Sequence, residues 1–270
     1  MKKIIFSDID KTLCMKKDLT ENTINIINKY ISFGGTFILV SGRGVKYTKM
    51  IANKIGNIRY IICNNGAIGY DIRHDKVIYK VPINIKSYEE ICKIAKWYDC
   101  SLIINTTNKM YAKGYYTKDG IYSKIDSIYD DKYDKDDVMQ IVLSCSKKED
   151  TKKVIDQIEK INGIKIINRH RSLYDDNYPE KENVWIDLTN ENVNKGYGVD
   201  MLCKHLNINL IDTVRIGDDL NDMTMFFDEG VNIAVENGIS NLKDKADIIV
   251  PSCTDEGAYK AISDIIDEKI

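Results

Sequence analysis

The chain opens with the apolar run IIF at residues 4–6 and continues into DIDKTL at residues 8–13. A short apolar run of this kind predicts a buried strand of a sheet that is covered on both faces. Asp8 and Asp10 follow it directly, so two carboxylates stand at the carboxyl end of that strand. Ligands of open α/β sheets bind at this end, because loops and helix N-termini with free backbone donors converge there. The stretch therefore predicts an α/β fold with an acidic group at its ligand-binding rim.

Strands and helices alternate on both sides of this opening. The next expected elements are a helix with apolar positions at 24, 27 and 31, a strand at 36–40, a helix at 45–55 and a strand at 58–63. The same alternation returns later, with strands expected at 184–188, 213–216, 231–235 and 248–250. This order implies right-handed crossovers. The predicted core is a Rossmann-like parallel sheet with helices on both faces.

The middle of the chain mixes helices with hairpin-like strands and is predicted to be an inserted α+β domain. Its expected elements are a helix at 88–98, a hairpin at 102–106 and 110–113, a strand at 140–144, a helix at 151–161 and a strand at 164–168. The predicted division is a core of residues 1–82 and 184–270 and an insert of residues 83–183. Residues 111–137 carry many tyrosines and charges without a clean period, which fits either a substrate-facing segment or a solvated connection.

Composition narrows the class of protein. Apolar residues make up 43% and charged residues 30% of the chain, and the formal net charge of −2 offers no basic excess for a nucleic-acid backbone. The basic start MKK resembles a signal peptide, but the carboxylates of DIDKTL interrupt the apolar stretch that would have to follow. The seven cysteines contain no C-x-x-C pair. We expect a cytoplasmic protein with reduced thiols and neither nucleic-acid nor membrane partners; its oligomeric state stays open.

Four polar groups are expected to share the rim, because each follows a predicted strand. They are residues 8–10, 41–43, 64–66 and 217–222. Each alone is also typical of a turn or helix cap, and a lone lysine such as Lys195 is commonly a solvated surface residue. Together the groups would bring four carboxylates close to one another, those of Asp8, Asp10, Asp218 and Asp222. Their repulsion requires a cation or a cationic side chain, and Lys195 could supply part of that positive charge. Hard oxygen ligands without a nearby histidine or cysteine favour Mg²⁺ as the cation.

In order and spacing, DIDKT, SGR, a lysine and GDDLND resemble the four motifs of the haloacid dehalogenase superfamily. NNGA at residues 64–67 and the long insert are similar to its Cof-like branch, subfamily IIB. The resemblance implies a hydrolase core with the insert as a cap domain that closes over the site and selects the leaving group. It also implies a Mg²⁺-dependent phosphatase that hydrolyses a small phosphorylated metabolite, such as a sugar phosphate, a nucleotide or a phosphorylated cofactor.

The resemblance also implies a role for each motif. Asp8 is the nucleophile that becomes an aspartyl phosphate, and Asp10 is the general acid and base. The magnesium ligands are Asp8, the backbone carbonyl of Asp10, Asp218 and Asp222. Substrate-binding residues are Ser41, Gly42, Arg43, Asn65, Gly66, Lys195 and Asn221. Among these, Ser41 and the Gly42 amide bind phosphoryl oxygens, and Lys195 neutralises charge.

Two rival functions share this pattern, and one residue departs from it. A phosphomutase would share the aspartyl-phosphate step, and a non-catalytic binding or regulatory protein would keep the fold without turnover. D-K-T also occurs in the phosphorylation motif of ion-pumping ATPases, but Leu13 breaks that motif. Lys11 stands where many relatives carry glycine, so the turn after Asp10 is expected to use positive φ less freely and to sit slightly differently.

Overall fold

The computed structural model describes residues 3–15, 18–114, 122–125, 133–145, 147–171 and 184–270. The chain divides into two compact units, each with its own sheet. The core unit comprises Met1–Arg43, Tyr47–Tyr79 and Asn194–Ile270. The inserted unit comprises Gly44–Lys46 and Lys80–Val193. Within the described residues, no helix combines the length and apolar character needed to cross a membrane.

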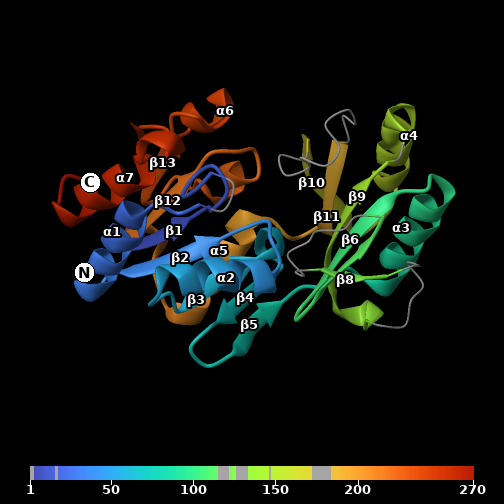
Figure 1. Cartoon of the computed structure of the whole chain (residues 1–270), viewed down its shortest axis with the longest axis horizontal. Coiled ribbons are helices and arrows are strands. Elements are labelled where there is room, and N and C mark those ends of the chain that lie inside the picture. Colours follow the sequence, from blue (N-terminus) through green and yellow to red (C-terminus); the bar gives the residue numbers. More distant parts are fainter. Residues whose placement is uncertain (1–2, 16–17, 115–121, 126–132, 146, 172–183) are drawn as a thin grey trace. The chain divides into compact units, whose positions relative to one another are not determined.

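The core unit is built on an eight-stranded sheet of order β14-β13-β12-β1-β2-β3-β4-β5 (Figure 1). Its strands are β1 (Ile4–Ser7), β2 (Thr36–Val40), β3 (Tyr60–Cys63), β4 (Ile68–Asp71), β5 (Lys76–Lys80), β12 (Thr213–Gly217), β13 (Val231–Val235) and β14 (Ile248–Val250). β1 lies at the centre and pairs in parallel with both β12 and β2. β4 runs antiparallel to β3, and this addition at one edge was absent from the sequence prediction.

Helices cover both faces of this sheet, which confirms the predicted fold class (Figure 1). They are α1 (Glu21–Ser32), α2 (Val45–Ile55), α5 (Lys195–Leu206), α6 (Ser240–Lys243) and α7 (Gly257–Ile266), with short 3₁₀ turns at Asn64–Gly66, Leu210–Asp212, Asp222–Met225 and Cys253–Asp255. Thr20 and Asn194 cap α1 and α5 by accepting hydrogen bonds from backbone amides. Against the sheet, α5 packs Val199 and Leu202 onto a fully buried cluster that includes Phe6.

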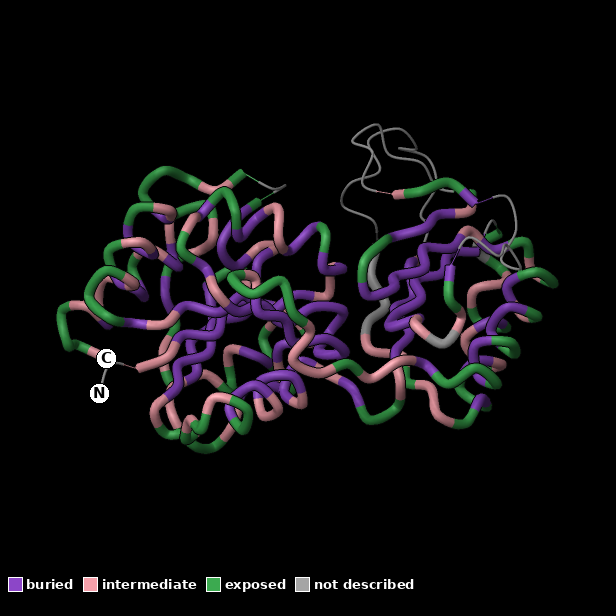
Figure 2. Tube along the Cα trace, turned by 90° about the horizontal axis from the view of Figure 1, so that it is seen from below, coloured by how far each residue is buried: buried purple, intermediate pink, exposed green. Residues whose placement is uncertain are grey.

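The inserted unit holds a six-stranded sheet of order β10-β11-β9-β6-β7-β8. Its elements are α3 (Ile85–Trp97), β6 (Ser101–Thr106), β7 (Met110–Lys113), β8 (Tyr122–Lys124), a 3₁₀ turn at Lys135–Asp137, β9 (Val138–Ser144), α4 (Lys148–Ile158), β10 (Ile164–Arg171) and β11 (Val184–Asn190). α3 and α4 pack on one face of the sheet, and apolar side chains from both helices and the strands form a single core there. Figure 2 shows that buried residues concentrate along the strands of each unit.

One expected strand belongs to a different sheet. Residues 184–188 were predicted to continue the parallel core sheet, but β11 pairs antiparallel with both β10 and β9 of the inserted unit. The inserted unit extends through Val193, past the boundary that was predicted at residue 184. Every residue from Trp185 to Thr189 is buried, and a strand buried on both faces does not reveal from its sequence which sheet it joins. Residues 111–137 were expected to form either a substrate-facing segment or a solvated connection. The structure places β8 within this range, and residues 115–121 and 126–132 lie outside the described residues.

Candidate active site

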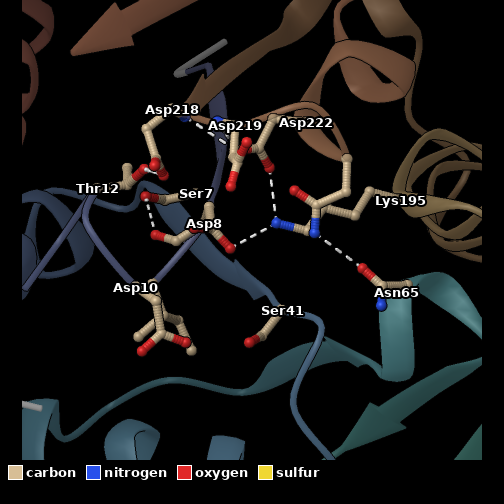
Figure 3. A network of polar contacts seen from close by, with 12 residues as sticks. Ser7, Asp8, Asp10, Thr12, Ser41, Asn65, Lys195, Asp218, Asp219 and Asp222 are labelled. Atoms are coloured by element: carbon tan, nitrogen blue, oxygen red, sulfur yellow. Dashed lines mark hydrogen bonds and ion pairs between the residues drawn. The ribbon is translucent and has the colours of Figure 1, made fainter. Parts of the chain in front are cut away.

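A buried lysine joins two of the predicted carboxylates. Lys195 Nζ donates hydrogen bonds to Asp8 Oδ1 at 2.5 Å and to Asp222 Oδ1 at 2.6 Å (Figure 3). Lys195 is 1% exposed, Asp8 6% and Asp222 0%. The position of Lys195 follows from local structure, because Asn194 caps the N-terminus of α5 and leaves Lys195 as its first helical residue. Lys195 is thus a buried partner of two carboxylates and not a solvated surface lysine.

The loop after β12 is shaped by the same Asp222. Its Oδ2 accepts hydrogen bonds from the backbone amides of Asp218 at 2.9 Å and Asp219 at 3.0 Å. Gly217 permits this fold, because a Cβ there would lie 2.6 Å from the Asp222 Cβ. Asp218 is held in turn by Thr12, whose hydroxyl donates to Asp218 Oδ1 at 2.7 Å. Asp222 therefore both pairs with Lys195 and orders the loop that presents Asp218.

Burial among like charges raises the pKa of the carboxylates. Burial is the largest cause for Asp8, whose pKa lies well above its usual value despite the opposing charge of Lys195. Burial and then the charge of Asp222 raise the pKa of Asp218 to about 7. Burial by itself lowers the pKa of Lys195. The negative charges and hydrogen bonds of Asp222 and Asp8 outweigh this effect, so the pKa of the lysine is raised. The group keeps one positive charge among three carboxyls, so a further cation would lower its free energy.

The donor set fits a hard divalent ion. Carboxylate oxygens of Asp8, Asp218 and Asp222 lie within 4.8 Å of one another, and all three residues are buried. Lys195 binds only Oδ1 of Asp8 and Thr12 binds only Oδ1 of Asp218, so neither bond uses the Oδ2 atoms. Oxygen ligands without histidine or cysteine suit Mg²⁺. Among the described residues, the Asp10 carboxylate is not part of this group.

Asp10 faces a different partner. Arg43 Nε donates to Asp10 Oδ2 at 3.0 Å, and both side chains are partly exposed. The Arg43 backbone amide also donates to Ser41 Oγ at 3.1 Å. Arg43 therefore holds the turn at residues 41–43 through its backbone and contacts Asp10 through its side chain. Figure 3 shows Asp10 and Ser41 apart from the two hydrogen bonds by which Lys195 joins Asp8 and Asp222. Arg43 thus orients the predicted acid and base; from the sequence we expected it only among the substrate-binding residues.

The NNG turn and the acidic loop meet directly. Asn221 Nδ2 donates to Asn65 Oδ1 at 2.9 Å. Asn65 has φ of 53° and its amide packs against Gly42, where a Cβ would lie 3.1 Å from Asn65 Oδ1. Gly66 has φ of 101°, and a Cβ there would lie 2.1 Å from the Asn194 carbonyl oxygen. Asn65 and Gly66 therefore brace the turn at residue 42 and the start of α5.

The backbone conformation at Lys11 differs from the one expected from the sequence. The turn after Asp10 does use positive φ, because Lys11 adopts φ of 66°. The conformation is held by the Lys11 amide, which donates to the Cys14 carbonyl at 2.8 Å, and by the Lys11 carbonyl, which accepts from Asn237 Nδ2 at 2.9 Å. Tertiary hydrogen bonds thus impose a left-handed conformation on a residue that ordinarily resists it.

The strain at Lys11 leads to a stability prediction. Lys11→Gly is expected to raise the free energy of unfolding by up to about 1 kcal/mol, because glycine adopts positive φ without steric strain and this gain exceeds its greater freedom in the unfolded chain. Chemical denaturation of both proteins measures the difference. Lys29→Gly, inside α1, is the control and should be destabilising. A less stable Lys11→Gly protein would contradict the prediction.

Thr12 contacts the candidate site, although sequence reasoning left it without a role. It is 0% exposed and bonds Asp218 across 206 positions of sequence. Its place in D-x-D-x-T was the available signal, since the threonine follows the two aspartates at fixed spacing. The remaining predicted residues all lie in the core unit, and contacts join most of them into three groups. The first contains Asp8, Lys195, Asp218 and Asp222, the second contains Asp10, Ser41 and Arg43, and the third contains Gly42, Asn65 and Asn221, while Gly66 packs against the start of α5.

The chain is similar to known proteins both in sequence and in fold. A family model described as haloacid dehalogenase-like hydrolase matches residues 5–262. A phosphoglycolate phosphatase of Sulfurisphaera tokodaii is 28% identical and covers 98% of this chain and 95% of its own. A haloacid dehalogenase-like hydrolase from Bacteroides thetaiotaomicron superposes with a TM-score of 0.82 at 18% identity, over 98% of this chain and 100% of its own. The HAD subclass IIB sugar phosphatase BT4131 gives a TM-score of 0.76 at 19% identity, over 97% and 98%.

The two superpositions show the fold, and the family model, which spans nearly the whole chain, shows the family. The predicted resemblance to the haloacid dehalogenase superfamily is confirmed. The chain belongs to the haloacid dehalogenase-like hydrolases.

Proposed function

We propose that the chain is a Mg²⁺-dependent phosphatase that hydrolyses a small phosphorylated metabolite through an aspartyl phosphate on Asp8. The observation that carries this proposal is the placement of Lys195 between Asp8 and Asp222, with Asp218 in the same buried group. A buried nucleophilic carboxylate beside a fixed cation is suited to a dianionic phosphoryl group. The phosphatase name of a relative aligned over most of this chain supports the same reaction.

In the first step, Asp8 attacks the phosphorus atom. Lys195 engages Oδ1, so Oδ2 forms the new O–P bond while the bond to the leaving oxygen breaks. Asp10 donates a proton to that oxygen, and Arg43 keeps the Asp10 carboxyl oriented. In the second step, Asp10 takes a proton from water, whose oxygen attacks the phosphorus and releases Asp8. One residue thus serves as acid and then as base.

Three residues of this chain bind the phosphoryl group of the substrate. The Ser41 hydroxyl and the Gly42 amide donate to its oxygens, and Lys195 offsets their charge. Asp8, Asp218, Asp222 and the Asp10 carbonyl would hold Mg²⁺. Bound Mg²⁺ supplies positive charge against the charge that builds on the phosphoryl oxygens in the transition state.

Asp10→Asn is expected to lower kcat for alkyl phosphates by roughly 10²–10⁴-fold, because the alkoxide then leaves without a proton. With p-nitrophenyl phosphate the rate of the first step should fall much less, because this leaving group departs without a proton. Steady-state and burst kinetics on glycerol phosphate and p-nitrophenyl phosphate measure both effects. Asp219→Asn, in the acidic loop but without a proposed proton-transfer role, is the control. Equal losses in the burst-phase rate on the two substrates would contradict a role in leaving-group protonation.

We assign the choice of leaving group to the inserted unit. Its helix-free sheet face carries Ile103, Val142 and Trp185 together with buried polar side chains on the same strands. The side-chain oxygens of Asn105 and Gln140, which pair in the β6–β9 register, have no hydrogen-bond partner among the described residues. Buried neutral polar groups of this kind gain stability from a ligand that supplies the missing bonds.

Gln140→Leu is therefore expected to raise KM for the preferred metabolite by roughly 10-fold, the equivalent of one lost hydrogen bond. The KM for p-nitrophenyl phosphate should stay nearly unchanged, because this ligand offers no matching hydroxyl group. Gln157→Leu, which makes the same substitution in α4 of the same unit, is the control. Equal changes on both substrates would show that Gln140 serves the fold and not recognition.

A phosphate-release screen over sugar phosphates, nucleotides and phosphorylated cofactors, run with Mg²⁺ and with EDTA, tests the proposal as a whole. We expect release with Mg²⁺ and none with EDTA. Isomerised product in place of free phosphate, when a hexose bisphosphate is added, would identify a mutase instead. Absence of turnover on every class, with p-nitrophenyl phosphate included, would leave the non-catalytic alternative.

A further inference from the structure

Two cysteines of the inserted unit face each other across neighbouring strands. Ser101 of β6 pairs with Ser144 of β9 in antiparallel register, so Cys100 and Cys145 stand opposite each other one position further along. Their sulfur atoms lie 3.8 Å apart. Both thiols belong to the apolar core under α3 and α4, at 0% and 3% exposure. Opposed positions on paired strands bring two Cβ atoms within the range that a disulfide spans.

We propose that Cys100 and Cys145 are a modification site that a thiol oxidant converts reversibly into a disulfide. The bond would close a loop of 45 positions and tie the start of β6 to the end of β9. Neither residue belongs to the phosphatase site of the core unit, so this proposal does not rest on the proposed function.

The surroundings of the pair give the two sulfurs different chemistry. A hydrogen bond from Cys100 is the largest cause that lowers the pKa of Cys145, with a contribution from Thr151 of α4, although burial opposes it. The same contact and burial raise the pKa of Cys100. Burial raises the pKa of Cys63 and Cys203 to about 12 each. Cys145 is therefore the better nucleophile of the pair.

A small disulfide such as bis(2-hydroxyethyl) disulfide supplies the oxidising equivalents. The Cys145 thiolate attacks one of its sulfurs, which forms a mixed disulfide and releases one 2-mercaptoethanol thiolate. The Cys100 sulfur then attacks the Cys145 sulfur, loses its proton, and releases the second molecule. Two protein thiols are oxidised and one small disulfide is reduced to two thiols. Local opening at the strand ends admits the reagent, because Asp99 and Lys147 beside the pair are exposed.

The test uses the full chain and needs no substrate. After treatment with bis(2-hydroxyethyl) disulfide and removal of the reagent, thiols titrated in denaturant should fall by two from the seven of the reduced protein. Peptide mapping without reductant should find Cys100 joined to Cys145, and dithiothreitol should restore all thiols. Seven remaining thiols, or a crosslink between other cysteines, would overturn the proposal.

Variants then test the order of events. Cys100→Ser should stop at a mixed disulfide on Cys145, seen as the mass of one 2-mercaptoethanol adduct, and Cys145→Ser should react at neither position. Cys92→Ser, a buried thiol in α3 of the same unit, should form the disulfide like the wild type. An adduct on Cys100 in Cys145→Ser would contradict the assigned nucleophile. The mapping of the wild-type protein stands even if a variant does not fold.

Discussion

Asp8→Asn is expected to lower kcat by roughly 10⁴-fold or more, with the fold intact, because the amide cannot form the aspartyl phosphate. The thermal unfolding midpoint should stay close to that of the wild type. Burial raises the pKa of Asp8, so its folded environment already disfavours the charge that asparagine removes. Lys195 also keeps its 2.6 Å bond to Asp222 in this variant. Phosphate release and a thermal melt, recorded on the same preparation, measure both quantities.

Asp18→Asn provides the matched control for this substitution. Asp18 is exposed and near the same catalytic loop in sequence, so the change should leave kcat as it is. After incubation with ³²P-labelled substrate and an acid quench, the wild type should retain protein-bound label and Asp8→Asn should not. Only the wild type should carry a transient phosphoryl group. Turnover of Asp8→Asn within a few-fold of the wild type would rule out the nucleophile assignment.

Lys195→Met is expected to reduce both stability and turnover, which separates it from Asp8→Asn. The substitution leaves the buried carboxylates of Asp8 and Asp222 without their shared cation. Breaking a buried ion pair from one side costs about 3–5 kcal/mol, which lowers the unfolding midpoint by on the order of 10 °C. Loss of the fixed charge beside the phosphoryl group should lower kcat by roughly 10²–10³-fold.

A second lysine on the same helix makes the comparison sharp. Lys204 of α5 pairs with Asp200 at the exposed surface, so Lys204→Met should change neither the midpoint nor kcat appreciably. Excess Mg²⁺ should recover part of the midpoint of Lys195→Met, since a divalent ion can replace charge within the carboxylate group. A midpoint equal to the wild type in the absence of metal would show that Lys195 does not neutralise this group.

The local sequence predicted most elements of the core, although not the edge strands β4 and β5, and it predicted which polar residues follow the central strands. The apolar run before Asp8 and the alternation of strand and helix patterns sufficed, because a parallel sheet places every strand's carboxyl end on one edge. Asp8, Asp218 and Asp222 were therefore predicted to meet although up to 214 positions separate them in the sequence, and the resemblance to a known family added Lys195; the folded chain brings all four into contact. Their catalytic roles remain predictions.

Other features depended on contacts that no local pattern encodes. β11 has the composition of a core strand, yet pairing with β9 and β10 places it in the second sheet. Lys11 takes a left-handed conformation because Asn237 and Cys14 bind its backbone. Arg43 orients Asp10, and Cys100 meets Cys145, only through the packing of separate segments. Periodicity reports which residues are buried, whereas the partner of each buried or polar group is chosen by the free energy of the whole fold.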